Sequence, residues 1–191
     1  IIEKFAIGYS LDIKDEFFKT AIKSGYQKQN IEKSGLVINN INNIIDRFRG
    51  RIIFPIRSMA GRVQGFGGRI LSKKFKTGKY INSPESIIYI KSKVLYGIYE
   101  SKKSIASQDL CYLVEGYTDV IQMHESGIQN VVSSSGTALS VEQIQIIKRL
   151  TNNVTLLFDS DEAGLNASLR GVDLFLEQGI NVRILIFPNG E

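Results

Sequence analysis

The chain has 191 residues, of which 43% are hydrophobic and 23% are charged. This length and balance are typical of a soluble globular protein with one or two domains. No apolar run approaches the ~20 residues that span a bilayer, and no secretory signal opens the chain, so we expect a cytoplasmic protein without a membrane partner. Because it has one cysteine, Cys111, and one histidine, the sequence excludes an internal disulfide and a four-ligand zinc site.

Charge is unevenly distributed along the sequence. Residues 1–46 carry 6 basic and 6 acidic side chains, residues 47–103 carry 14 and 2, and residues 104–191 carry 4 and 11. A basic segment next to an acidic one suits a track for a polyanion beside a site that concentrates cations. A solvated lysine-rich face is the alternative explanation for the basic segment.

Residues 1–46 are predicted to be mostly helical, because apolar residues between Phe17 and Ile22 recur at helical spacing. Ser34-Gly35 and the asparagines among residues 39–43 mark breaks. Since Ile1 is not an initiator methionine, we expect the chain to start inside a larger protein.

Residues 51–71 favour two strands separated by a turn at residues 59–62. The second strand contains Gly65, Gly67 and Gly68, which indicates either a close approach to the backbone or a bulge. Residues 73–83 are predicted to be a basic loop and residues 92–104 a helix, with Tyr96 and Tyr99 on or near its packed face.

A regular alternation of strands and helices follows. Ser140 and Gln143 form a predicted capping box at the start of a helix whose buried stripe is Ile144, Ile147 and Leu150. This alternation predicts an α/β fold with a mostly parallel four-stranded sheet flanked by helices, preceded by a basic α+β subdomain. The predicted strands are 110–114, 131–132, 154–158 and 182–187, and the helices are 119–125, a helix starting after Ser140, and 163–178.

Carboxylates follow two of these strands, at the sheet edge where parallel sheets bind ligands. They are Glu115, Asp119, Asp159 and Asp161. Neighbouring carboxylates repel one another unless a cation compensates them, and magnesium accepts such oxygen ligands, which favours phosphoryl or nucleotidyl transfer. The alternatives are a helix cap for either aspartate of the Asp159–Asp161 pair and a salt-bridged strand end for Glu115. The loop 133–137 either presents amides to a phosphate or only connects a strand to a helix.

Three blocks in the second half resemble the successive motifs of a TOPRIM domain. They are Glu115–Asp119 (EGYTD), Gly136–Leu139 (GTAL) and Phe158–Gly164 (FDSDEAG). That domain is shared by bacterial primases, topoisomerases of types IA and II, some nucleases and recombination mediators. The TOPRIM resemblance alone therefore leaves the activity open.

The first half resembles the catalytic core of bacterial DnaG-type primases. The similar blocks are Arg47–Ile56, Gly61–Arg69, Lys79–Glu85 with Lys91, and Lys4–Tyr9. The resemblance covers essentially the whole chain and implies two domains, a basic N-terminal α+β subdomain over 1–104 and a TOPRIM domain over 105–191. It also implies that the TOPRIM domain is truncated, since a further acidic motif normally follows residues 188–191.

The resemblance implies roles for particular residues. Glu115, Asp159 and Asp161 are expected to be catalytic and, with Asp119, to hold Mg²⁺ (or Mn²⁺). Phosphates of nucleotide or nucleic acid are expected to meet a further group of polar and basic residues. This group comprises Lys4, where the family often has arginine, and Arg69, Lys79, Asn82 and Lys91.

The implied function is synthesis of short RNA primers on single-stranded DNA in a bacterial cytoplasm. The partners would be the DNA template, the RNA primer, nucleoside triphosphates and, through a region outside this chain, the replicative helicase. Zinc would belong only to a domain outside this chain. Another TOPRIM enzyme, such as a topoisomerase or nuclease, and a non-catalytic nucleic-acid-binding module remain as alternatives.

Overall fold

The computed structural model describes residues 1–40, 43–71, 78–136, 138–158 and 162–185, without the side chains of 162–168. The chain forms two compact units. Ile2–Pro55 and Gln64–Ile90 make up the N-terminal unit, and Ile56–Val63 and Lys91–Glu191, with Ile1, make up the parallel-sheet unit. Residues 91–104 thus group with the parallel sheet, and the division into domains at residue 104 stays a prediction.

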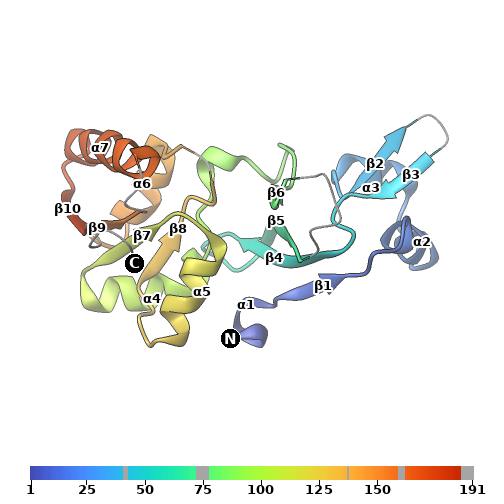
Figure 1. Cartoon of the computed structure of the whole chain (residues 1–191), viewed down its shortest axis with the longest axis horizontal. Helices are drawn as coiled ribbons and strands as arrows, with labels where there is room; N and C mark the ends of the chain where they lie inside the picture. Colours follow the sequence, from blue (N-terminus) through green and yellow to red (C-terminus); the bar gives the residue numbers. More distant parts are fainter. Residues whose placement is uncertain (41–42, 72–77, 137, 159–161, 186–191) are drawn as a thin grey trace. The chain divides into compact units, whose positions relative to one another are not determined.

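The parallel-sheet unit contains the predicted α/β fold, which is confirmed. Its four strands lie in the order β10-β9-β7-β8, and all three pairings are parallel (Figure 1). The strands are β7 (Cys111–Val114), β8 (Val131–Ser133), β9 (Asn153–Leu157) and β10 (Asn181–Leu185). The helices are α4 (Ile98–Gln108), α5 (Tyr117–Glu125), α6 (Val141–Lys148) and α7 (Glu162–Glu177).

The core of this unit forms where the apolar faces of strands and helices meet. Leu113 of β7, Leu156 of β9, Ile144 and Ile147 of α6 and Phe175 of α7 are all fully buried. Burying each such side chain contributes about 1.5–3 kcal/mol before the entropy cost of ordering it. The predicted stripe of α6 is therefore confirmed at Ile144 and Ile147, while the third member of that stripe is only partly buried.

The N-terminal unit contains two small sheets (Figure 1). One has the order β1-β4-β5-β6 and the other pairs β2 with β3. The strands are β1 (Gly8–Ser10), β2 (Val37–Asn40), β3 (Asn43–Asp46), β4 (Arg51–Arg57), β5 (Val63–Ile70) and β6 (Tyr80–Asn82). The helices are α1 (Ile2–Phe5), α2 (Glu16–Lys23) and α3 (Lys28–Lys33).

Three sequence-based expectations for the first half need correction. Residues 1–46 are not mostly helical, because β1 and the β2–β3 hairpin lie there, and Asn40 pairs with Asn43 where breaks were expected. Part of the expected basic loop is strand β6, which pairs with β5. The helix expected over 92–104 begins only at Ile98, because Gly97 adopts a left-handed φ of 82°.

The glycines of β5 make room for the unit's own side chains. A Cβ on Gly65 would lie 2.6 Å from the ring of Tyr89, and one on Gly68 would lie 2.6 Å from the ring of Phe48. Of the two predicted explanations, a close approach to the strand backbone holds at these positions, and the groups that approach are aromatic rings of the same unit.

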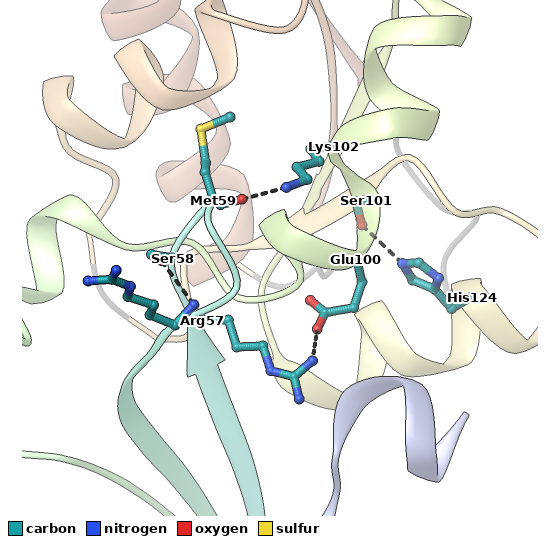
Figure 2. A network of polar contacts seen from close by, with 8 residues as sticks. Arg57, Ser58, Met59, Glu100, Ser101, Lys102 and His124 are labelled. Atoms are coloured by element: carbon teal, nitrogen blue, oxygen red, sulfur yellow. Dashed lines mark hydrogen bonds and ion pairs between the residues drawn. The ribbon is translucent and has the colours of Figure 1, made fainter.

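The predicted turn between β4 and β5 is confirmed. It lies within Ile56–Val63, which belongs to the parallel-sheet unit, and polar contacts hold it against α4 of that same unit (Figure 2). Arg57 forms an ion pair of 3.0 Å with Glu100, and the Lys102 ammonium donates to the carbonyl of Met59 at 2.6 Å. Next to them, Ser101 and the buried His124 lie within hydrogen-bonding distance, at 3.0 Å.

In the part of the chain described, no helix combines the length and apolar character needed to cross a membrane.

Candidate active site and nucleic-acid interface

Glu115 lies at the carboxyl end of β7, a central strand, as predicted. Its backbone carbonyl accepts a hydrogen bond of 2.7 Å from the hydroxyl of Ser133, the fully buried last residue of β8. The same hydroxyl accepts from the amide of Ser135 at 2.8 Å. Ser133 therefore joins the ends of two neighbouring strands and restrains the backbone that carries the Glu115 carboxylate.

A pocket of about 210 Å³ opens beside Glu115. Its walls are mainly apolar, but Glu115 and Arg170 supply one negative and one positive charge. Such a pair suits a ligand with anionic groups that a cation partly compensates. The remaining lining residues are Ser134, Gly136, Ala138, Leu139, Phe158, Gly171 and Leu174.

Asp119 serves as a helix cap in this structure. One of its carboxylate oxygens accepts a 2.8 Å hydrogen bond from the amide of Gly116, and the other accepts one of 3.4 Å from the hydroxyl of Thr118. These bonds stabilise the first turn of α5. Carboxylate oxygens have further lone pairs, so the cap leaves Asp119 able to bind a cation.

The other two predicted metal ligands, Asp159 and Asp161, lie outside the described residues. Among the residues that are described, no group of three or more histidine, cysteine, aspartate or glutamate side chains converges on one point. The half-buried Glu115 provides a hard oxygen donor at the sheet edge where β9 also ends. That donor chemistry fits Mg²⁺, and the metal role of all four carboxylates stays a prediction.

Three of the predicted phosphate-binding residues come together on the β5–β6 hairpin of the N-terminal unit. Arg69 of β5 pairs with Tyr80, and Asn82 pairs with Gly67. The Arg69 guanidinium and the Lys79 ammonium lie 5.6 and 6.0 Å from the centre of the Tyr80 ring. Two cations thus gather around one exposed aromatic ring, an arrangement typical of single-stranded nucleic acid binding.

Arg51 supports this hairpin from within the unit. Its side chain is buried, and its guanidinium donates to the carbonyls of Gly78 at 3.1 Å and Lys79 at 3.3 Å. Burial lowers the pKa of Arg51 below its ordinary value, although an arginine stays charged at neutral pH. Arg51 therefore orders the backbone beside Lys79, a role that composition alone did not reveal.

The two remaining predicted phosphate-binding residues lie elsewhere. Lys4 is exposed on the short helix α1, and Lys91 opens the 3-10 turn η1 (Lys91–Lys93) in the parallel-sheet unit. The predicted capping box at Ser140 is confirmed, because Ser140 and Gln143 exchange two hydrogen bonds of 3.1 Å. Both side chains also contact the η1 segment, which sequence reasoning missed because its residues are about 50 positions away.

Two known families match the chain. The family described as "DNA primase catalytic core, N-terminal domain" matches residues 1–102, and the family described as "Toprim-like" matches residues 112–191. A DNA primase of Clostridium acetobutylicum is 38% identical over 191 residues, and the alignment covers all of this chain but 31% of that protein.

Solved structures agree with these matches. The Aquifex aeolicus primase (zinc-binding and RNA polymerase domains) superposes with a TM-score of 0.92 at 34% identity, covering 100% of this chain and 47% of that one. A DnaG primase catalytic domain bound to single-stranded DNA superposes at 0.88 with 37% identity, covering 100% and 60%. The chain spans about a third of the relative from C. acetobutylicum. With the first family matching more than half of its residues, the chain belongs to the bacterial DnaG-type DNA primases and comprises catalytic-core and TOPRIM sequence.

Proposed function

We propose that the protein containing this chain synthesises short RNA primers on single-stranded DNA by metal-dependent nucleotidyl transfer. The observation that carries the proposal is the position of Glu115. It follows a central strand of a TOPRIM-type sheet and lines a pocket that also presents Arg170. The match of the whole chain to DNA primases supports the same activity.

In this proposal the carboxylates Glu115, Asp159 and Asp161 hold Mg²⁺ or Mn²⁺, and Asp119 contributes from the capped turn of α5. An ion held by these carboxylates would supply positive charge that compensates the phosphate oxygens during transfer. Ser133 keeps the Glu115 backbone in place through its 2.7 Å hydrogen bond. Arg170 supplies a positive charge at the same pocket, which suits the triphosphate of an incoming nucleotide.

The β5–β6 hairpin would bind the template or primer. Arg69 and Lys79 would contact phosphates, which gives affinity without sequence selectivity. The exposed Tyr80 between them offers a ring for stacking a base. A primase relative, a DnaG catalytic domain bound to single-stranded DNA, supports binding of the template by the catalytic core. Lys4, Asn82 and Lys91 remain proposed phosphate contacts, and the replicative helicase remains a proposed partner of the parent protein.

The test is primer synthesis on single-stranded DNA by the full-length parent protein and its Glu115→Gln variant, with Mg²⁺ or Mn²⁺. Loss of one ligand carboxylate should reduce synthesis by at least about a hundredfold. Glu125→Gln makes the same change on the exposed end of α5 and should keep full activity. Synthesis by the Glu115 variant at the parent's rate would refute the role of Glu115. If the parent makes no primers but relaxes or cleaves DNA, another TOPRIM enzyme is favoured.

A further inference from the structure

The side chain of Gln143 holds the segment that carries Lys91. Gln143 is fully buried, and its amide nitrogen donates to the carbonyls of Val94 at 2.8 Å and Lys91 at 3.2 Å. Its amide oxygen accepts from the backbone of Ser140 at 3.1 Å. One side chain therefore caps α6 and binds both ends of a short stretch of backbone.

Ser140 has the same double role. Its hydroxyl accepts from the amide of Gln143 at 3.1 Å and donates to the carbonyl of Ser92 at 2.6 Å. Consequently three of the four carbonyls from Lys91 to Val94 accept hydrogen bonds from the first turn of α6. We call residues 91–97 the strap.

The other end of the strap is bound to the sheet edge beside Glu115. Tyr96 and Ser133 exchange two backbone hydrogen bonds of 2.9 and 3.0 Å, and Tyr96 packs edge-on against Tyr117 with ring centres 4.7 Å apart. Ser133 in turn donates to the Glu115 carbonyl. The backbone of Lys91 is thus connected with that of Glu115 within the parallel-sheet unit by hydrogen bonds at both ends of the strap and by the strap's own backbone between them.

We propose that Ser140 and Gln143 are positioning residues, which fix the strap so that the Lys91 ammonium is presented to a phosphate group of the substrate. This inference rests on the proposed function, because it takes Lys91 as a phosphate ligand. A lysine side chain has four rotatable bonds, so a fixed backbone restricts where its charge can reach and lowers the entropy lost on binding. The phosphate belongs either to a nucleoside triphosphate or to the nucleic acid.

A substitution at Ser140 can remove the hydrogen bond to the strap while keeping the one that caps α6. Aspartate at an N-cap accepts the Gln143 amide as serine does, but a carboxylate cannot donate to the Ser92 carbonyl. Ser140→Asp should therefore keep the thermal unfolding midpoint within a few degrees while loosening the strap. Ser140→Thr retains donor and acceptor and serves as the conservative rescue.

The experiment uses the full-length parent protein and measures Kd for ATP and for a labelled single-stranded oligonucleotide. Ser140→Asp should weaken one of them about three- to tenfold, as expected for one lost hydrogen bond, and Ser140→Thr should restore it to within about twofold. Where the parent synthesises primers, KM for the same ligand should rise by the same factor with kcat nearly unchanged.

The decisive comparison is a double-mutant cycle with Lys91→Ala. If Ser140 acts through Lys91, Ser140→Asp should cause no further loss in the Lys91→Ala protein, whereas a general structural effect would add to it. Gln143→Glu, which keeps the cap oxygen and removes the amide donor, should give the same pattern. If the effects of the Ser140 and Lys91 substitutions are coupled in the Kd for ATP, the phosphate belongs to the nucleotide; if they are coupled in the Kd for the oligonucleotide, it belongs to the nucleic acid. Additive losses, or a Kd that is unaffected for both ligands, would overturn the proposal. A parent protein that shows the coupling without making primers would refute the proposed function and leave the positioning role standing.

Discussion

Several polar or reactive residues have structural roles that become visible only from their surroundings. Cys111 begins the central strand β7 and is fully buried. Asp46, at the end of β3, accepts hydrogen bonds of 2.6 and 3.1 Å from the amides of Phe17 and Phe18 at the start of α2. At the scale of single residues, burial therefore decides what these groups do.

Cys111 is expected to be unreactive in the folded protein. Burial raises the pKa of its thiol above the ordinary value, so the nucleophilic thiolate is scarce and inaccessible at neutral pH. Alkylation by iodoacetamide should be at least about a hundredfold slower in the native protein than in denaturant, as expected when labelling requires opening of the sheet. Because the chain has a single cysteine, mass spectrometry of the labelled protein measures this directly, and equal rates would contradict the burial of β7.

Asp46 is expected to contribute to the pH dependence of stability. Burial raises its pKa, and this effect outweighs the opposing hydrogen bonds from Phe17 and Phe18. A carboxyl group with a raised folded pKa stabilises the fold below its ordinary pKa of 3.8, and that contribution is lost as the pH rises through the folded value.

The neutral variant Asp46→Asn lacks this dependence. Its free energy of unfolding relative to the unmodified chain should therefore increase as the pH rises from about 4 through the folded pKa. Urea unfolding of both proteins across this range measures the difference. A relative stability that falls with pH would mean that the amide hydrogen bonds outweigh desolvation and that the folded pKa is lowered.

At the scale of elements, local signals were predicted well and pairing between distant segments was not. The capping box of Ser140 and Gln143 spans four residues and was confirmed. Strand β6 was not predicted, because its conformation depends on pairing with β5 and on hydrogen bonds from Arg51 to the carbonyls just before it, rather than on its own composition. The β2–β3 hairpin was missed for the same reason, since its asparagines pair across the hairpin.

The glycines of β5 provide a test at this scale. Gly65→Ala would place a Cβ 2.6 Å from the Tyr89 ring, so the ring or the strand must move. Overpacking of this kind costs about 1–3 kcal/mol, and the free energy of unfolding should fall by that amount in urea titrations. Gly8→Ala in β1, where nothing lies within 4 Å, is the matched control. Equal stability of the two variants would rule out the close packing of Tyr89 on β5.

At the scale of the whole molecule, the separation of charge along the chain matches the proposed division of work. The basic segment 47–103 includes the Arg69 and Lys79 pair around Tyr80, whereas the acidic segment 104–191 includes the carboxylate at the end of β7. The proposed surface for nucleic acid and the proposed site for cations therefore come from different stretches of sequence.

The basic hairpin should dominate binding of single-stranded DNA. Arg69→Ala combined with Lys79→Ala removes two proposed phosphate contacts, so affinity should fall and the slope of log Kd against log salt should flatten by about 1.4. Fluorescence anisotropy at several salt concentrations measures both quantities. The control, Lys23→Ala with Lys33→Ala, removes the same charge from exposed positions on α2 and α3. An identical change of slope in that control would show that the effect comes from net charge and not from the β5–β6 hairpin.

The sequence by itself determined the α/β class, the family, the position of Glu115 after a strand and the capping box of α6, because these depend on hydrophobic period, motif order and contacts a few residues apart. Only the tertiary structure decided that Arg170 shares a pocket with Glu115, that Arg51 orders the backbone at Lys79, and that Gln143 binds the strap. These contacts join residues tens of positions apart, and a buried side chain finds its partners only once the sheet and helices have packed. Local patterns in a sequence carry little information about such long-range partners.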